Sequence, residues 1–359
     1  MKIKNYSQLA VTRERKLVLQ AFEKALEAID PYEITKKEAR KINPREYERI
    51  FVVAFGKASV PMAKAVEETL PVFKGIASSP FSAKLKKTKV IVGGHPLSNE
   101  KSLKAGKEVL KIVTEACKGD LVLMLISGGG SALAEIPRVS LKALQSATQD
   151  LMKNGAGIQE LNCVRRHLSE IKGGKLADAC KGKIIALVLS DVIENHLDCI
   201  ASGAAIGDST TFAEALEIAR KYKVRNKEVL RLLEKGARGE IPENPRHVDA
   251  ENKIIASNET ALNAAKRFLE SKGIRFKHVY EDFEVNADAL GTEFALKLET
   301  GGNFIAGGES TVVVKGKGRG GRNQQMALRA LEVLSKLNSK ENSKGMLIAC
   351  FGTDRKCVV

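Results

Sequence analysis

The chain has 359 residues, of which 43% are hydrophobic and only 5% aromatic, a composition typical of a globular protein large enough for two domains. Its 59 Lys and Arg residues exceed its 43 Asp and Glu residues, for a formal net charge of +16. The two signs are mixed along helical stretches, and the arginine-rich tail or aromatic-interleaved patch expected of a nucleic-acid-binding module is missing.

Cysteine spacing and hydropathy exclude further classes. The six cysteines include no C-x-x-C pair, and the histidines beside them lack the spacing of metal ligands. The sequence also contains neither an apolar run of about 18 residues nor the apolar region of a signal peptide. We therefore expect a cytoplasmic protein with reduced thiols and no membrane partner.

Helical and strand patterns alternate along the first two thirds of the chain. Apolar residues at helical spacing predict an amphipathic helix over 7–29. Short, almost continuous apolar runs predict strands that each end in a turn of small or polar residues, at 50–55, 90–92, 121–126 and 184–189. Runs of this kind are typical of strands covered on both faces. We expect an α/β fold with a doubly wound parallel sheet, helices on both faces and ligands at the carboxyl ends of the strands.

The polar, proline-containing segment 239–249 predicts a linker. We therefore place an N-terminal α/β domain over residues 1–240 and a smaller α/β domain over residues 245–359. In the smaller domain, strands are predicted over 253–256, 276–280, 311–314 and 346–351, with a helix after residue 323.

A glycine-rich segment follows the strand predicted over 121–126. Three successive glycines let backbone N–H groups point at one anion, so we expect phosphate binding by the residues Ser127, Gly128, Gly129, Gly130 and Ser131. The segment is not a Walker motif, because no Gly-Lys-Ser/Thr follows it. A tight turn that needs positive φ is the alternative explanation.

The segment 316–323 combines four glycines with three cationic side chains between a predicted strand and a helix. Backbone amides, a helix N-terminus and a guanidinium together can bind phosphate groups. We therefore expect phosphate binding by Gly318, Gly320, Gly321, Arg322 and Asn323. The segment also matches G-x-G-x-x-G at 316, 318 and 321. A dinucleotide fold needs an acidic residue at the end of the next strand, about 20 residues on, and neither Glu341 nor Asp354 stands there.

Charged residues at the ends of other predicted strands are further candidate site residues. Lys57 directly follows a strand, where a cation is unfavourable unless an anion joins it. Asp191, Glu309 and Asp354 could hold magnesium or accept a hydroxyl proton, although each alone is more often a cap or turn residue. Arg165 and Lys172 add cations that could bind a substrate carboxylate, and we assign His167 a structural role.

At these residues the chain resembles the glycerate 2-kinase family, whose C-terminal domain is called MOFRL. The resemblance rests on motifs that occur in the family's order over essentially the whole chain. They are Ala54-Phe55-Gly56-Lys57-Ala58, Ser127-Gly128-Gly129-Gly130-Ser131, Asn162-x-Val164-Arg165-x-His167-Leu168-Ser169, Lys172-Gly173-Gly174, Ser190-Asp191-Val192, Gly307-Gly308-Glu309-Ser310-Thr311, Gly316-x-Gly318-x-Gly320-Gly321-Arg322-Asn323 and Gly352-Thr353-Asp354.

The resemblance implies ATP-dependent phosphorylation of the 2-hydroxyl of D-glycerate, with Mg²⁺ or another divalent cation and a site between the two domains. It implies that Lys57 and Arg322 neutralise the transferring phosphoryl group, with Asp191 as a further catalytic residue and Glu309 and Asp354 as metal ligands. Glycerate and ATP are the expected partners, without a specific nucleic acid, and a homodimer is the expected assembly.

The chain departs from the family after Gly352-Thr353-Asp354. Where relatives continue with a segment rich in Asp, Gly and Thr, this sequence ends Arg355-Lys356-Cys357-Val358-Val359, so we expect an incomplete, truncated C-terminal domain. The alternatives are an NAD(P)H-dependent hydroxypyruvate reductase, which the missing ribose-binding carboxylate disfavours, a nucleic-acid-binding module, and a catalytically inactive truncated remnant.

Overall fold

The computed structural model describes residues 3, 5–190, 199–313, 316, 320–337 and 346–352. The chain divides into a larger unit, Pro31–Ile255, and a smaller unit that joins Met1–Asp30 to Ala256–Val359. The division therefore differs from the predicted boundary at 240–245 in two ways. Val248 and Ala250 pack against the core of the larger unit, so the predicted linker belongs to that unit. Ala21 and Ala25 form a core cluster with Ala265 and Leu269, so the first helices belong to the smaller unit.

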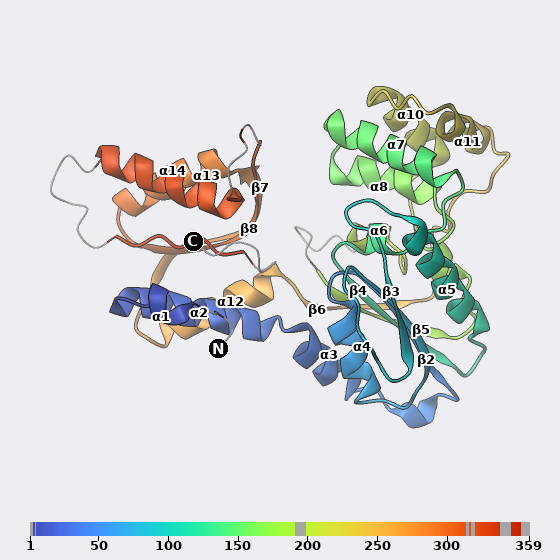
Figure 1. Ribbon diagram of the computed structural model, residues 1–359, viewed down its shortest axis with the longest axis horizontal. Coiled ribbons are helices and arrows are strands. Elements are labelled where there is room, and N and C mark those ends of the chain that lie inside the picture. The colour runs from blue at the N-terminus through green and yellow to red at the C-terminus, as the bar shows by residue number, and fades with distance from the viewer. Residues whose placement is uncertain are drawn as a thin grey trace. The chain divides into compact units, whose positions relative to one another are not determined.

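The larger unit is built on a six-stranded sheet in the order β3-β2-β1-β4-β5-β6 (Figure 1). The first four neighbouring pairs are parallel. The strands are β1 (Ile50–Phe55), β2 (Val72–Ser79), β3 (Thr88–Val92), β4 (Leu121–Ser127), β5 (Lys183–Leu189) and β6 (Glu251–Ala256). This order is that of a doubly wound fold, and its switch point lies between β1 and β4. The predicted fold class is confirmed.

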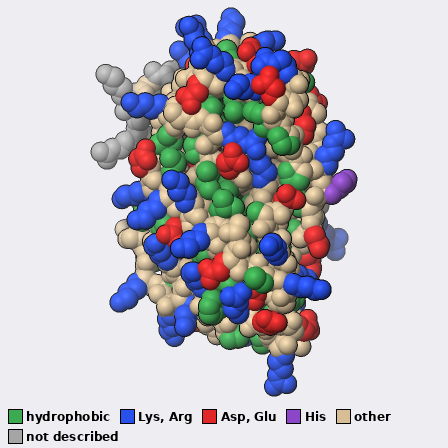
Figure 2. All heavy atoms as spheres, turned by 90° about the vertical axis from the view of Figure 1, so that its right-hand side faces the viewer, with side chains coloured by type: hydrophobic (Ala, Val, Ile, Leu, Met, Phe, Trp, Pro, Cys, Tyr) green, Lys and Arg blue, Asp and Glu red, His purple; other side chains and the backbone are tan. Residues whose placement is uncertain are grey.

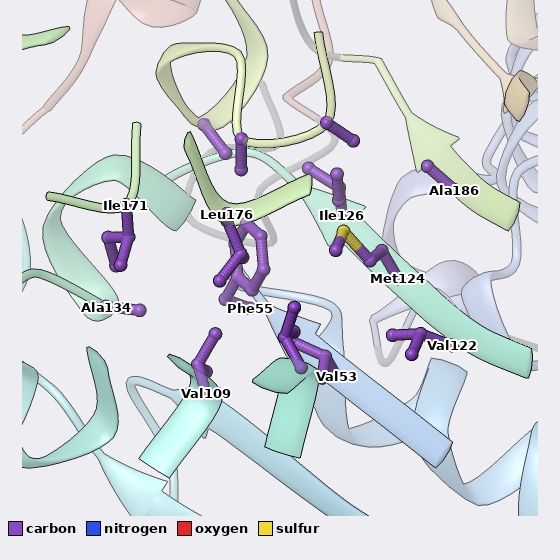
Figure 3. Close-up of a cluster of buried hydrophobic side chains, with 14 of the residues drawn as sticks. Val53, Phe55, Val109, Val122, Met124, Ile126, Ala134, Ile171, Leu176 and Ala186 are labelled. Carbon is purple, nitrogen blue, oxygen red and sulfur yellow. The ribbon is translucent and has the colours of Figure 1, made fainter. Parts of the chain in front are cut away.

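The two central strands are buried along their whole length, as their apolar sequences predict. Alternate residues of β1 face opposite sides of the sheet. Phe51, Val53 and Phe55 belong to one core cluster, whose side chains Figure 3 shows, and Val52 and Ala54 belong to another on the opposite face. Helices thus cover both faces of this sheet.

The helices of the larger unit are α3 (Pro31–Ala39), α4 (Ser59–Glu67), α5 (Glu100–Glu115), α6 (Gly130–Leu133), α7 (Leu141–Lys153), α8 (Ile158–His167), α9 (Lys175–Asp178), α10 (Phe212–Lys221) and α11 (Lys227–Ala237), with the 3₁₀ turns η1 (Pro44–Glu46) and η3 (Ile200–Ser202). Several begin at a polar N-cap residue, for example Asn99 before α5 and Thr211 before α10. Helices α7, α8, α10 and α11 share a separate apolar core away from the sheet.

The smaller unit contains a parallel pair of strands, β7 (Phe276–Asn286) and β8 (Asn303–Thr311). Its helices are α1 (Tyr6–Leu9), α2 (Arg13–Ala28), α12 (Asn258–Glu270), α13 (Ala287–Glu299) and α14 (Arg322–Leu337). The strand predicted over 311–314 is wrong in position, because the strand that precedes the second glycine-rich segment ends at Thr311. The strand predicted over 346–351 is also wrong, since only Phe351 makes a bridge there.

The charged side chains are spread over the visible surface. On the face shown in Figure 2, Lys and Arg are interspersed with Asp and Glu and do not gather into one patch. Within the residues that the structure describes, no helix combines the length and the apolar character needed to span a membrane. The charged residues on this face are therefore distributed as expected for a solvated, mixed surface.

Candidate active site

The candidate site of the larger unit lies where β1 and β4 end side by side. Phe55 pairs with Ile126 in the parallel register of these strands, so the residues that follow them emerge at the same edge. The two following turns are hydrogen-bonded to each other. The Lys57 N–H donates to the Gly128 carbonyl at 2.9 Å, and the Ala58 N–H donates to Ser127 Oγ at 3.0 Å. The predicted glycine-rich loop and Lys57 are thus brought together at the switch point of the sheet, where open α/β sheets bind ligands.

Two glycines of this edge are required by their surroundings. Gly56 has a φ of +129°, and a Cβ atom there would lie 2.2 Å from Ser127 Oγ and 2.4 Å from the Ser127 carbonyl oxygen. Gly129 has a φ of +81° and immediately precedes α6. The backbone can therefore make this close approach only without side chains at both positions.

The side chains of Lys57 and His95 both approach Gly129. A Cβ atom on Gly129 would be 2.8 Å from His95 Cδ2 and 3.5 Å from Lys57 Cε. Both side chains are exposed at this edge of the sheet. We predicted Lys57 as a site residue but gave His95 no role, although it follows the strand predicted over 90–92 in a Gly-Gly-His-Pro turn. Its position after a strand was the available signal.

Ser131 is the first member of a side-chain relay. Its Oγ lies 2.8 Å from Ser202 Oγ, and the Ser202 hydroxyl donates to Asn162 Oδ1 at 2.9 Å. Asn162 Nδ2 in turn donates to the Cys199 carbonyl at 3.4 Å. Ser202 and Asn162 are fully buried, and Ser131 is partly exposed. The relay therefore runs from the interior to the glycine-rich loop.

The backbone around Ser202 adopts the left-handed conformation at three successive residues. The φ angles of Ala201, Ser202 and Gly203 are +50°, +55° and +67°. For a residue with a side chain this conformation costs about 1 to 2 kcal/mol. The Gly173 and Gly174 N–H groups hold it by donating to the Ser202 and Gly203 carbonyls at 3.1 and 2.8 Å.

The two cations predicted to bind the substrate carboxylate face an internal carboxylate. Lys172 is 2% exposed, and its ammonium forms an ion pair with Glu135, which is equally buried. The Ser169 hydroxyl donates to the same carboxylate at 2.5 Å. Burial lowers the pKa of Lys172, while the charge of Glu135 opposes that shift. Burial also lowers the pKa of Arg165, with Glu135 again opposing the shift. An anionic ligand could therefore reach Lys172 only by displacing Glu135.

A second buried polar cluster holds the turn at Gly173. Arg166 Nη1 and Asp208 form an ion pair at 2.8 Å, and Asn244 Nδ2 donates to the other Asp208 oxygen at 2.8 Å. The Lys175 ammonium donates to the Arg166 carbonyl at 2.9 Å. Burial, reinforced by the charge of Arg138, lowers the pKa of Lys175 to about 7.

His167 next to this cluster has the structural role predicted for it. The side chain is fully buried, and its Nδ1 lies 2.8 Å from the Cys163 carbonyl oxygen. The ring packs edge-on against Phe212 at 4.6 Å between centroids. Burial lowers the pKa of His167.

The predicted site residues of the smaller unit surround the start of α14. Arg322 is the first residue of that helix, and its Nη2 lies 2.7 Å from Glu309 Oε1 in β8. The side chains are 45% and 52% exposed, respectively, so the pair lies at the surface. Gly320, Gly321 and Asn323 flank Arg322, and Gly320 has a φ of +158°. The predicted residues Asp191, Gly318 and Asp354 lie outside the described residues.

The described residues do not bring together a carboxylate set for a divalent cation. No group of three or more His, Cys, Asp or Glu side chains with metal-binding geometry occurs among them. Glu309 has Arg322 as its charge partner. Mg²⁺ is usually held by one or two carboxylates together with substrate phosphates, so Glu309 and Asp354 stay predictions for the metal ligands.

Comparisons with known proteins identify relatives over most of the chain. A family model described as "Domain of unknown function (DUF4147)" matches residues 17–234, and the MOFRL family matches residues 302–356. A Pyrococcus horikoshii protein named "Glycerate 2-kinase" is 38% identical over 95% of this chain and 82% of its own length. A Thermotoga maritima protein named "D-glycerate 2-kinase" is 34% identical over 95% of this chain and 82% of its own length. A crystal structure described as a glycerate kinase from Thermotoga maritima matches with a TM-score of 0.79 and 35% identity, covering 89% of this chain and 80% of that chain.

Proposed function

The chain belongs to the DUF4147 family, matches the MOFRL family over residues 302–356 and is related to the two glycerate 2-kinases named above, and we propose that it is itself a glycerate kinase. In the proposed reaction, the γ-phosphoryl group of ATP passes to the 2-hydroxyl of D-glycerate and yields 2-phosphoglycerate and ADP. The observation that carries the proposal is the hydrogen-bonded pairing of the Lys57 turn with the Gly128–Gly130 loop at the ends of β1 and β4. Family membership and this pairing support the same conclusion from independent directions.

Phosphoryl transfer requires little covalent chemistry from a protein, and most of the catalysis is positioning and charge stabilisation. The N–H groups of Gly130 and Ser131 lie in the first turn of α6, where a helix offers them no internal acceptor. We assign the transferring phosphoryl group to these amides, with the Lys57 ammonium neutralising its charge. Gly129 has no side chain that would keep a phosphate away from these groups.

Arg322 is proposed as a second cation for the phosphates. Its forked guanidinium can bind two phosphate oxygens, and it begins α14 beside Gly320 and Gly321. Its present partner is the exposed carboxylate of Glu309, and exposed ion pairs contribute only about 0 to 1 kcal/mol. A phosphate could therefore replace that partner at little cost. Asp191, Glu309 and Asp354 stay predictions for the base or the metal ligands.

Mg²⁺, which we expect to enter as the ATP complex, would supply charge neutralisation at the β- and γ-phosphates. The described residues offer no carboxylate set for it, so the roles proposed for Lys57, the loop amides and Arg322 do not depend on a metal ligand from them.

The proposal is tested by incubating the purified chain with D-glycerate, ATP and Mg²⁺ and following the products by ³¹P NMR. We expect the signals of 2-phosphoglycerate and ADP. A parallel reaction with hydroxypyruvate and NADH, followed at 340 nm, tests the reductase alternative. Oxidation of NADH without phosphorylation of glycerate would overturn the kinase proposal. The position of the new phosphate, read from its coupling to the C2 or C3 protons, separates the 2-phosphate from the 3-phosphate.

A further inference from the structure

The relay behind the glycine-rich loop fixes the direction of its hydrogen bonds. A backbone carbonyl only accepts, so the contact with the Cys199 carbonyl must be made by Asn162 Nδ2. Asn162 Oδ1 therefore faces Ser202 and takes the single proton of the Ser202 hydroxyl. The 2.8 Å contact between the two serines then needs the proton of Ser131. The Ser131 oxygen is left with lone pairs alone for any ligand.

The direction of these hydrogen bonds decides which kind of ligand group the Ser131 oxygen can bind. Phosphate and carboxylate oxygens are acceptors, so they would meet a lone pair and be repelled. A divalent cation would be drawn to lone pairs, but the positive charge of Lys57 opposes one here, since Lys57 Cε would lie 3.5 Å from a Cβ atom on Gly129. A neutral hydrogen-bond donor suits both the lone pairs of the Ser131 oxygen and the positive charge near it. The hydroxyl group of a small substrate is such a donor.

On the basis of the proposed function, we infer that Ser131 is a specificity residue that accepts a hydrogen bond from the non-reacting hydroxyl of the hydroxy-acid substrate, with Ser202 and Asn162 as the residues that hold it in the accepting state. The reacting hydroxyl is excluded, because it must give up its proton during the transfer and a neutral serine is too weak a base to take it. The inference keeps our prediction that the loop of Ser131 binds phosphate through its backbone amides. It adds a separate role for the Ser131 hydroxyl.

The strained backbone gives the same assignment a physical basis. Ala201 and Ser202 adopt positive φ although both have side chains, and the Gly173 and Gly174 amides hold them there. Strain of this kind persists only where the surroundings over-determine it, and it gathers at functional sites. Here its effect is to aim the Ser202 hydroxyl at both Asn162 and Ser131.

The test compares the affinities of D-glycerate and D-lactate, because D-lactate keeps the carboxylate and the 2-hydroxyl and lacks only the non-reacting 3-hydroxyl. Binding is measured by ligand-observed NMR titration, which does not need turnover. We expect the wild-type chain to bind D-glycerate about tenfold more tightly, the value of one hydrogen bond of about 1.4 kcal/mol. Ser131→Ala should weaken D-glycerate binding by the same factor and leave D-lactate binding nearly unchanged.

Further variants separate the relay from a general loss of folding. Ser131→Thr keeps the hydroxyl and should restore most of the preference. Ser202→Ala should reduce the preference to about threefold, and Ser131→Ala/Ser202→Ala should match Ser131→Ala alone, since Ser202 acts only through Ser131. Ser140→Ala removes a hydroxyl that caps α7 and should keep the full preference. Additive losses in the double variant would overturn the relay.

The outcomes also separate this inference from the proposed function. The inference would be overturned, and the kinase proposal left intact, if the chain phosphorylates D-glycerate but binds D-lactate equally tightly. The same holds if Ser131→Ala weakens the binding of both acids by the same factor. A preference that depends on Ser131 in a protein that phosphorylates neither acid would support the inference and overturn the kinase. Failure to bind either acid would overturn both.

Discussion

The two segments 127–131 and 316–323 are both rich in glycine but differ in how the fold holds them. In the first, Ser127, Gly128 and Gly130 are buried, and the loop is hydrogen-bonded to the turn after β1. In the second, the described residues Gly316, Gly320 and Arg322 are exposed, and the charge partner of Arg322 is equally exposed. Glycine in the first segment and at Gly56 is needed for close packing, whereas Gly316 and Gly320 in the second lie at the surface. Substitutions in the two regions should therefore have different effects.

The largest expected effect is on stability at Gly56. A side chain there would overlap Ser127 and force an unfavourable φ, so Gly56→Ala should lower the free energy of unfolding by about 3 to 5 kcal/mol. Gly320→Ala is the matched control. Among the described residues, its Cβ would meet the flexible end of Gln324, at 2.8 Å, and we expect a loss of about 1 kcal/mol. Urea unfolding measures both, and equal losses would contradict the comparison.

The second effect is on activity. Lys57→Ala should lower kcat by about 100-fold, as for the removal of one charge-stabilising group, with little change in the midpoint of thermal unfolding. Arg322→Ala should behave in the same way, because its exposed pair with Glu309 contributes little to stability. Lys64→Ala removes another exposed lysine, in α4, to which we assign no role in the site, and it should keep full activity. Wild-type turnover in Lys57→Ala would remove the main support for its assignment.

The smallest effect concerns the buried charges of the larger unit. The pKa of Lys175 is about 7 in the fold and has its ordinary, higher value in the unfolded chain. Between those values the unfolded chain binds more protons, so the free energy of unfolding should rise with pH above 7, by up to about 1.4 kcal/mol per pH unit. Below pH 7 the lysine is charged in both states and this contribution to the slope disappears. Urea unfolding between pH 6 and 9 should show the slope in the wild type and a smaller one in Lys175→Met.

Much of the fold could be predicted because its central strands are continuous apolar runs. The strand over 50–55 was predicted with the bounds it has, and the site followed from it, since parallel strands bring Lys57 and the Gly128 loop to one edge. Strand β2 was missed, because its sequence Val-Phe-Lys-Gly-Ile-Ala-Ser-Ser mixes polar residues and a glycine with apolar ones. Glycine is required at position 75 because a Cβ atom there would lie 2.5 Å from Thr88 Oγ1 in the neighbouring strand. This contact exists only in the folded sheet.

The relay could not be predicted. Ser131, Asn162 and Ser202 come from three segments far apart in the chain, and their meeting depends on positive φ at two residues with side chains. Sequence patterns assign that conformation to glycine, so they contain no signal for it here. The burial of Lys172 was missed for a related reason. Its partner Glu135 lies 37 positions earlier, and only the fold brings the two together.

The smaller unit is discontinuous in sequence, and this affects the order in which the protein can fold during synthesis. Helix α2 is synthesised before the larger unit, but its core partners Ala265 and Leu269 are made only after the whole larger unit. The larger unit is one continuous segment and can complete its sheet meanwhile. During that interval the apolar face of α2 has no native partner in α12. During synthesis the chain therefore carries an amphipathic helix that is not yet paired with α12, which makes that helix the expected contact for a chaperone.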